Sequence, residues 1–91
     1  MDTTETGTTS DHGRLIDEAR GRIDALDARI IELVRERVGV SEGIQRARIE
    51  AGGRRLQLTR ENDILRRYHE QLGEPGTRLA MTLLELCRGR A

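Results

Sequence analysis

The chain has 91 residues, enough for one small domain. Its 16 basic and 16 acidic residues cancel, which argues against a general nucleic-acid binder, because such proteins rely on many uncompensated cations. No apolar run approaches the ~20 residues that a membrane span needs. No signal-peptide pattern opens the chain, so we expect a soluble cytoplasmic protein without membrane contact.

The residues that bind metals or form disulfides are sparse. Cys87 is the single cysteine, and it lies far in the sequence from His12 and His69, so we expect no internal disulfide, no metal site and no cofactor. All 16 basic residues are arginine. This bias either indicates recognition of carboxylates or phosphates, or reflects a GC-rich genome, so each arginine must be argued by its position.

A polar tail and one long helix are predicted for the first half of the chain. Residues 1–12 have nothing apolar to bury and are predicted to be disordered, which leaves a domain over residues 13–91. Residues 13–51 predict one helix that ends at Gly52-Gly53. Ten of its eleven heptad seam positions are apolar, and the exception is an arginine: Ile16, Ala19, Ile23, Leu26, Ile30, Leu33, Arg37, Val40, Ile44, Ala47, Ala51.

Two shorter helices are predicted after a connection at residues 54–58. The second begins near Leu58 or Thr59 and ends before the turn-forming residues 73–76 (GEPG). The third covers residues 77–88. Both carry apolar stripes, and no segment alternates with a period of two, so the sequence predicts an all-α fold with one long and two short helices.

The long helix predicts a dimer. About 38 residues rise ~57 Å, whereas a compact domain of this size has a diameter on the order of 30 Å. Two short helices cannot cover so long a seam, so we expect a second copy, in an intertwined homodimeric helical bundle. A plain coiled coil with disordered ends would leave the stripes of the later helices without a function.

Several polar residues stand on faces that should be apolar. Arg37 interrupts the seam, and Arg48 lies three turns further along the same face, about 16 Å away, with Ser41 on the strip between them. Glu61, directly after Arg60, interrupts the stripe of the second helix. Together they predict a buried polar cavity that binds a small anion by electrostatics, since no catalytic triad or phosphate loop is present in the sequence. Each residue alone could instead set register, and Arg37 could pair with Glu61.

These residues resemble the all-helical AroQ-class chorismate mutases over about residues 14–90. The resemblance rests on Arg20, Ile23-Asp24-Ala25-Leu26-Asp27, Leu33-Val34, Arg37, Ala47-Arg48 and Arg60-Glu61. It implies an intertwined dimer with two composite active sites and no cofactor. It further implies conversion of chorismate to prephenate, a [3,3]-sigmatropic rearrangement in phenylalanine and tyrosine biosynthesis.

The resemblance also implies roles for the arginines. Arg20 would reach into the partner's site and bind a substrate carboxylate, and Arg37 would bind a carboxylate within its own chain. Arg48 stands where many relatives have lysine and would donate to the ether oxygen and a carboxylate. Arg60 would bind the ring carboxylate.

The residues near the substrate ring and at the C-terminus carry further implied roles. Glu61 would accept the ring hydroxyl, and Gln57 replaces the aspartate of some relatives. The best-known members have serine and glutamine on the third helix, but this chain ends Cys87-Arg88-Gly89-Arg90-Ala91. That ending resembles a short subclass that is weak alone and is activated by docking on 3-deoxy-arabino-heptulosonate-7-phosphate (DAHP) synthase. Arg88 would bind substrate or would be a frayed, solvated end.

Two other hypotheses about the function remain open. A 4-amino-4-deoxychorismate mutase or an isochorismate pyruvate lyase would use the same cationic pocket and would differ in its contact at ring C4, near Glu61 and Gln57. A noncatalytic helical dimerisation module would account for the heptads but would give no reason for Arg37 and Glu61 on apolar faces.

Overall fold

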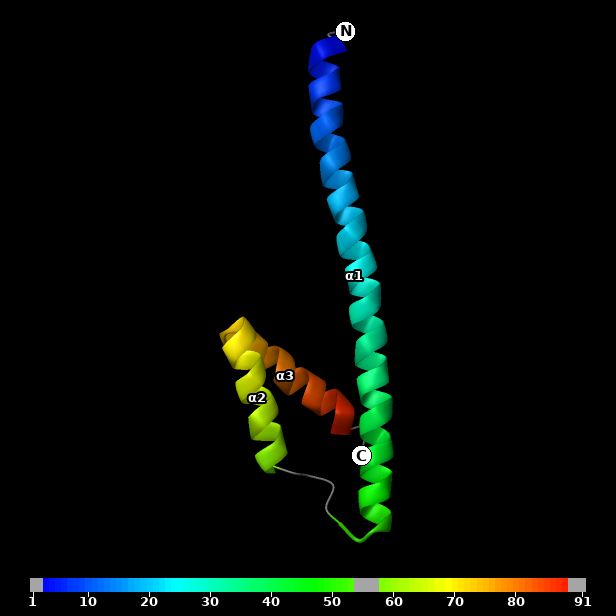
Figure 1. Ribbon diagram of the computed structural model, residues 1–91, viewed down its shortest axis with the longest axis vertical. Helices are drawn as coiled ribbons and strands as arrows, with labels where there is room; N and C mark the ends of the chain where they lie inside the picture. Colours follow the sequence, from blue (N-terminus) through cyan, green and yellow to red (C-terminus); the bar gives the residue numbers. More distant parts are fainter. Residues whose placement is uncertain (1–2, 54–57, 89–91) are drawn as a thin grey trace. The chain divides into compact units, whose positions relative to one another are not determined.

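The structure, a computed structural model, describes residues 3–53 and 58–88, with side chains from residue 11 onward. It contains α1 (Thr3–Glu50), α2 (Leu58–Leu72) and α3 (Glu74–Arg88), shown in Figure 1. No strand occurs in these described ranges, so the predicted all-α fold with one long and two short helices is confirmed. The chain divides into two units, residues 1–33 and 34–91, and α2 and α3 belong to the second.

The start of α1 differs from the expected one. The helix begins at Thr3, ten residues before the predicted start at Gly13, so residues 3–12 are helical where the composition predicted disorder. Lengthening an existing helix adds one hydrogen bond per residue without a new nucleation cost, and this favours propagation into a polar segment. The domain boundary at residue 13 stays a prediction.

The end of α1 is the predicted glycine cap. Gly52 has a φ of 82°, which glycine adopts without strain, and its N–H donates to the Ile49 carbonyl at 2.9 Å. The Gly53 N–H donates to the Arg48 carbonyl at 2.7 Å. This pair of bonds is a Schellman motif, which satisfies carbonyls that the helix end would leave free.

A single glycine joins α2 to α3. Gly73 has a φ of 76°, and its N–H donates to the His69 carbonyl at 2.7 Å. Its own carbonyl accepts from the N–H of Gly76 at 2.9 Å and of Thr77 at 3.2 Å, so it also starts the next helix. Therefore α3 begins at Glu74, three residues before the predicted start. Pro75 fits there because a first-turn residue needs no N–H donor.

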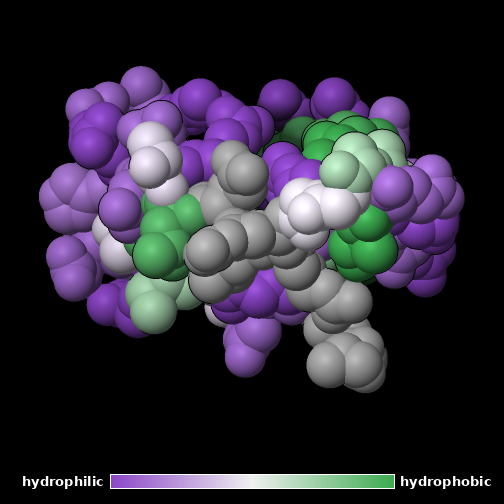
Figure 2. Space-filling view, turned by 90° about the horizontal axis from the view of Figure 1, so that it is seen from below, coloured by the Kyte–Doolittle hydropathy of each residue, from purple (hydrophilic) through white to green (hydrophobic). Residues whose placement is uncertain are grey.

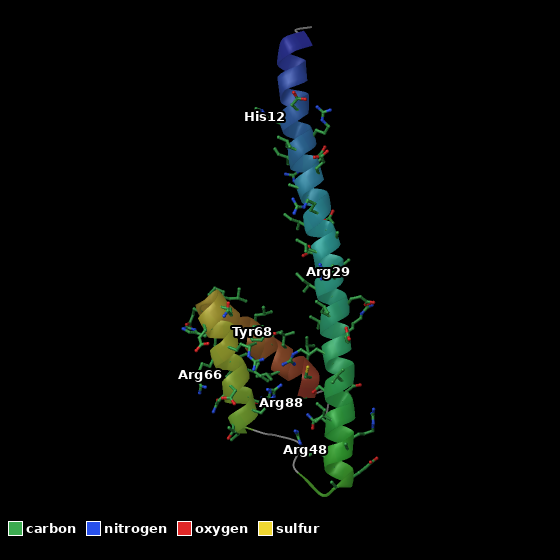
Figure 3. All side chains as sticks on the ribbon, viewed as in Figure 1. His12, Arg29, Arg48, Arg66, Tyr68 and Arg88 are labelled. Carbon is green, nitrogen blue, oxygen red and sulfur yellow. The ribbon has the colours of Figure 1, made fainter. Side chains whose placement is uncertain are left out.

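The short helices α2 and α3 pack against each other and form a small core. Ile64 from α2 and Ala80 and Leu84 from α3 are buried together, and Leu65 and Tyr68 pack against them. The two helices approach closely at Gly76, where a Cβ would lie 2.4 Å from the Tyr68 carbonyl oxygen. Figure 3 shows Tyr68 on α2 beside α3.

The predicted seam of α1 is largely uncovered in the chain. Between 49% and 60% of the surface is exposed at Ile16, Ile23, Leu26, Ile30, Leu33, Val40 and Ile44. Figure 2 shows hydrophobic side chains interrupting a mostly hydrophilic surface. Over the described residues, no helix is both long and apolar enough to cross a membrane.

Candidate functional site

A polar strip runs along the C-terminal part of α1. Arg37, Ser41, Gln45 and Arg48 follow one another at intervals of four, four and three residues, which places them on one helix face. All four are partly buried. The predicted shared face of Arg37 and Arg48 is therefore present, with Ser41 between them.

Gln45 belongs to this strip and was not among the predicted site residues. Its Oε1 is buried and has no hydrogen-bond partner among the described residues. A buried acceptor without a donor is costly, so this atom is suited to a donor that arrives with a ligand or a second chain. Its helical spacing from Ser41 and Arg48 was the signal in the sequence.

The last turn of α3 contacts the strip through Cys87. Arg37 Nη1 donates to Cys87 Sγ at 2.8 Å. Ser41 Oγ donates to the Cys87 carbonyl oxygen at 3.4 Å. Cys87 is only 5% exposed, and both hydrogen bonds are partly buried. Two polar residues of α1 are thereby fixed to the end of α3.

The next residue contacts α2. Arg88 Nη2 donates to Glu61 Oε1 at 2.6 Å, and the side chains are 42% and 16% exposed, respectively. Figure 3 shows Arg88 on α3. The structure thus pairs Glu61 with Arg88, and Arg37 donates to Cys87 instead of pairing with Glu61. Arg88 is the last residue of α3 and is held in an ion pair, so it is not the frayed, solvated end that the sequence left open.

Two of the other predicted site residues are exposed. Arg60 is exposed on α2, and Arg20 is exposed on α1 in the first unit. Gln57 lies outside the described residues. The candidate site within the second unit therefore consists of Arg37, Arg48 and Arg88 with Glu61.

The charges of this group suit a dianion. The group contains three guanidinium groups and one carboxylate, so its formal charges sum to +2. Guanidinium groups bind carboxylates with paired, charge-assisted hydrogen bonds. A small dicarboxylate is the class of ligand that neutralises such a group.

Comparison with known proteins gives the class. Residues 19–84 match the chorismate mutase type II family, and this segment is most of the chain. The chain belongs to this family, whose members are isomerases. The resemblance inferred from residues 23–27 and from the spaced arginines and Glu61 is confirmed.

Relatives in mycobacteria agree with the family. The intracellular chorismate mutase of Mycolicibacterium smegmatis is 48% identical over 75 residues, which cover 82% of this chain and 72% of that protein. The intracellular chorismate mutase of Mycobacterium tuberculosis is 49% identical over 75 residues, covering 82% of this chain and 70% of that protein. Chorismate mutase is the function that the family and these relatives share, and it is the predicted function.

A solved structure has the same fold. It is a non-covalent complex of DAHP synthase and chorismate mutase from Corynebacterium glutamicum with a bound transition state analog. The matching chain superimposes with a TM-score of 0.79 at 38% identity, over 84% of this chain and 92% of that one.

Proposed function

We propose that the chain converts chorismate to prephenate in a pocket formed by Arg37, Arg48 and Glu61, with Arg20 contributed by a second copy. The observation that supports this most is the pair of partly buried arginines on one face of α1, together with a mostly buried glutamate on α2. An unpaired buried charge is costly, and a dianionic ligand would neutralise this group.

Binding and conformation supply the first part of the catalysis. Chorismate carries two carboxylates, and Arg37, Arg20 and Arg60 would bind them as forks. The pocket would hold the compact pseudo-diaxial conformer, in which the two carbons that form the new bond lie close together. Selecting this conformer lowers the entropic part of the barrier, and no enzyme atom bonds to the substrate.

Electrostatic stabilisation supplies the second part. As the ether C–O bond breaks, negative charge accumulates on its oxygen, and Arg48 would stabilise that charge more than the ground state. Glu61 would accept a hydrogen bond from the ring hydroxyl. A carboxylate has several acceptor positions, so Oε2 can take this hydroxyl while Oε1 keeps Arg88. Gln57 and Arg88 would complete the polar rim.

The site needs a second copy of the chain. The exposed apolar face of α1 would be covered by α1 of a partner in an intertwined homodimer. Arg20, exposed on α1, would then enter the partner's pocket. This arrangement accounts both for the uncovered seam and for an exposed arginine on the part of α1 that belongs to the first unit.

We further propose that a DAHP synthase docks on the dimer and raises its activity, inside the cytoplasm. Support comes from the Corynebacterium complex, and from the mycobacterial relatives that are named intracellular. A kinetic titration with the cognate synthase tests this. We expect kcat/KM to rise to a plateau at saturating synthase, and an unchanged kcat/KM would exclude the partner.

The activity itself is tested by following the loss of chorismate absorbance with purified protein. Parallel assays with 4-amino-4-deoxychorismate and isochorismate address the alternatives on the same fold. We expect turnover of chorismate to prephenate. Preference for the amino compound, or release of pyruvate, would change the substrate assignment, and no turnover with or without synthase would exclude a mutase.

A binding assay separates catalysis from simple helix pairing. A bicyclic dicarboxylate that mimics the transition state should raise the melting temperature of the protein. A noncatalytic dimerisation module would show no such shift.

A further inference from the structure

The last two residues of α3 connect the two sides of the candidate site. Cys87 contacts Arg37 and Ser41 of α1, and Arg88 contacts Glu61 of α2. Within the described part of residues 34–91, α2 and α3 are the only helices whose backbones pack closely together. Through its thiol, Cys87 links the side chain of Arg37 to this pair of helices.

We propose that Cys87 is a positioning residue that holds the guanidinium of Arg37 in the orientation that binds the substrate carboxylate. The inference rests on the proposed function. An arginine side chain has many rotamers, and ordering it on ligand binding costs conformational entropy. The hydrogen bond from Nη1 to Cys87 Sγ orders the side chain before the substrate arrives.

The chemistry of sulfur suits this task. A thiol is a weak acceptor without a negative charge, so it orients the guanidinium without neutralising it. A carboxylate at the same position would hold Arg37 more strongly but would compete with the substrate. The contact uses one N–H of the five on the guanidinium, which leaves the others for a carboxylate. The burial of Cys87 keeps water from replacing the thiol.

Three substitutions at this position separate the hydrogen bond from packing. Cys87→Ala and Cys87→Val remove the acceptor, and Val keeps an apolar side chain in the buried site. Cys87→Ser keeps a small acceptor. We expect Cys87→Ala and Cys87→Val to raise the KM for chorismate about tenfold and to leave kcat nearly unchanged. A tenfold change lies at the lower end of the range of effects for losing a hydrogen bond to a charged group. The KM of Cys87→Ser should stay close to the wild-type value.

A double-mutant cycle with Arg37→Ala tests whether the two residues are coupled in kcat/KM. A purely structural role of Cys87 would give no such coupling. If Cys87 acts through Arg37, Cys87→Ala should have no further effect on kcat/KM in the Arg37→Ala background. Additive losses would overturn the inference, and so would equal losses in folded Ala, Val and Ser variants. Circular dichroism and thermal melting confirm that each variant is folded.

The outcomes distinguish this inference from the proposed function. An active wild type with unaffected Cys87→Val and Cys87→Ala variants would overturn the positioning role and leave the mutase function intact. A wild type without mutase activity would overturn both.

Discussion

Arg48 lies in the last turn of α1, on the polar strip that also carries Arg37. Its charge there favours the helix, because the C-terminal end carries a partial negative charge. Two effects must therefore be separated when it is replaced, the loss of the cation near the substrate and a small loss of helix stability. A substitution that keeps the charge separates them.

We expect Arg48→Ala to lower kcat by about 10²–10³, as removal of a donor to a developing oxyanion does. Arg48→Lys is the matched control and should keep most of the activity, since lysine is the residue that the family resemblance implies at this position. Steady-state kinetics measures both, and size-exclusion chromatography should show an unchanged oligomer. A near-normal kcat in Arg48→Ala would refute the role.

The Arg88–Glu61 pair is asymmetric in its exposure. The side chain of Glu61 is 16% exposed and that of Arg88 is 42% exposed. Water can therefore hydrate the guanidinium more easily than the carboxylate, and the carboxylate relies more on its partner for hydrogen bonds. Removing one partner of a pair costs most when the remaining charge is buried.

We expect Arg88→Met to lower the free energy of unfolding by about 1–3 kcal/mol, because it leaves a mostly buried carboxylate without its donor. Glu61→Gln should change it by less than ~1 kcal/mol, since the exposed guanidinium can be hydrated. Urea denaturation without ligand measures both. Equal losses in the two variants would contradict the argument. Adding Glu61→Gln to Arg88→Met should recover stability.

At the scale of elements, the junction of α2 and α3 shows how one position can limit a fold. The sequence predicted a four-residue break at residues 73–76. In the structure Gly73 alone separates the two helices, and α3 begins at the next residue. The early start brings Gly76 against the end of α2, where a Cβ would lie 2.6 Å from the Leu72 Cβ. This closeness depends on packing between two helices, so helix propensity alone could not predict it.

We expect Gly76→Ala to destabilise the protein by about 1–3 kcal/mol, because a methyl group there forces the two helices apart. Gly21→Ala is the matched control, since nothing lies within 4 Å of a Cβ at that position. It should stabilise the protein by about 1 kcal/mol through helix propensity. Thermal melting of the two variants should give shifts of opposite sign, and a stabilised Gly76→Ala would show that the contact is not limiting.

At the scale of the whole molecule, the seam of α1 is the main apolar surface that remains exposed to solvent. Its isoleucines and leucines are about half exposed in the chain, whereas Ala80, Leu84 and Ile64 form the small buried core of α2 and α3. Apolar surface of this extent typically marks an interface with another chain.

We expect Leu26→Glu, at a seam position, to abolish the homodimer and with it most of the mutase activity. Ala28→Glu introduces the same charge on the opposite face of α1 and is the matched control, which should leave both unchanged. Analytical ultracentrifugation and the chorismate assay measure the outcome. A dimeric and active Leu26→Glu variant would exclude this face as the interface.

The sequence by itself determined the number and order of the helices, the glycine cap of α1, the shared face of Arg37 and Arg48, and the family. These features depend on local hydrogen bonding, on the helical period and on residues at fixed spacing. Only the tertiary structure decided that Glu61 pairs with Arg88, and that Cys87 accepts from Arg37 and Ser41. Those contacts join residues 27 to 50 positions apart, so they depend on how α3 folds back along the chain, which no local pattern encodes.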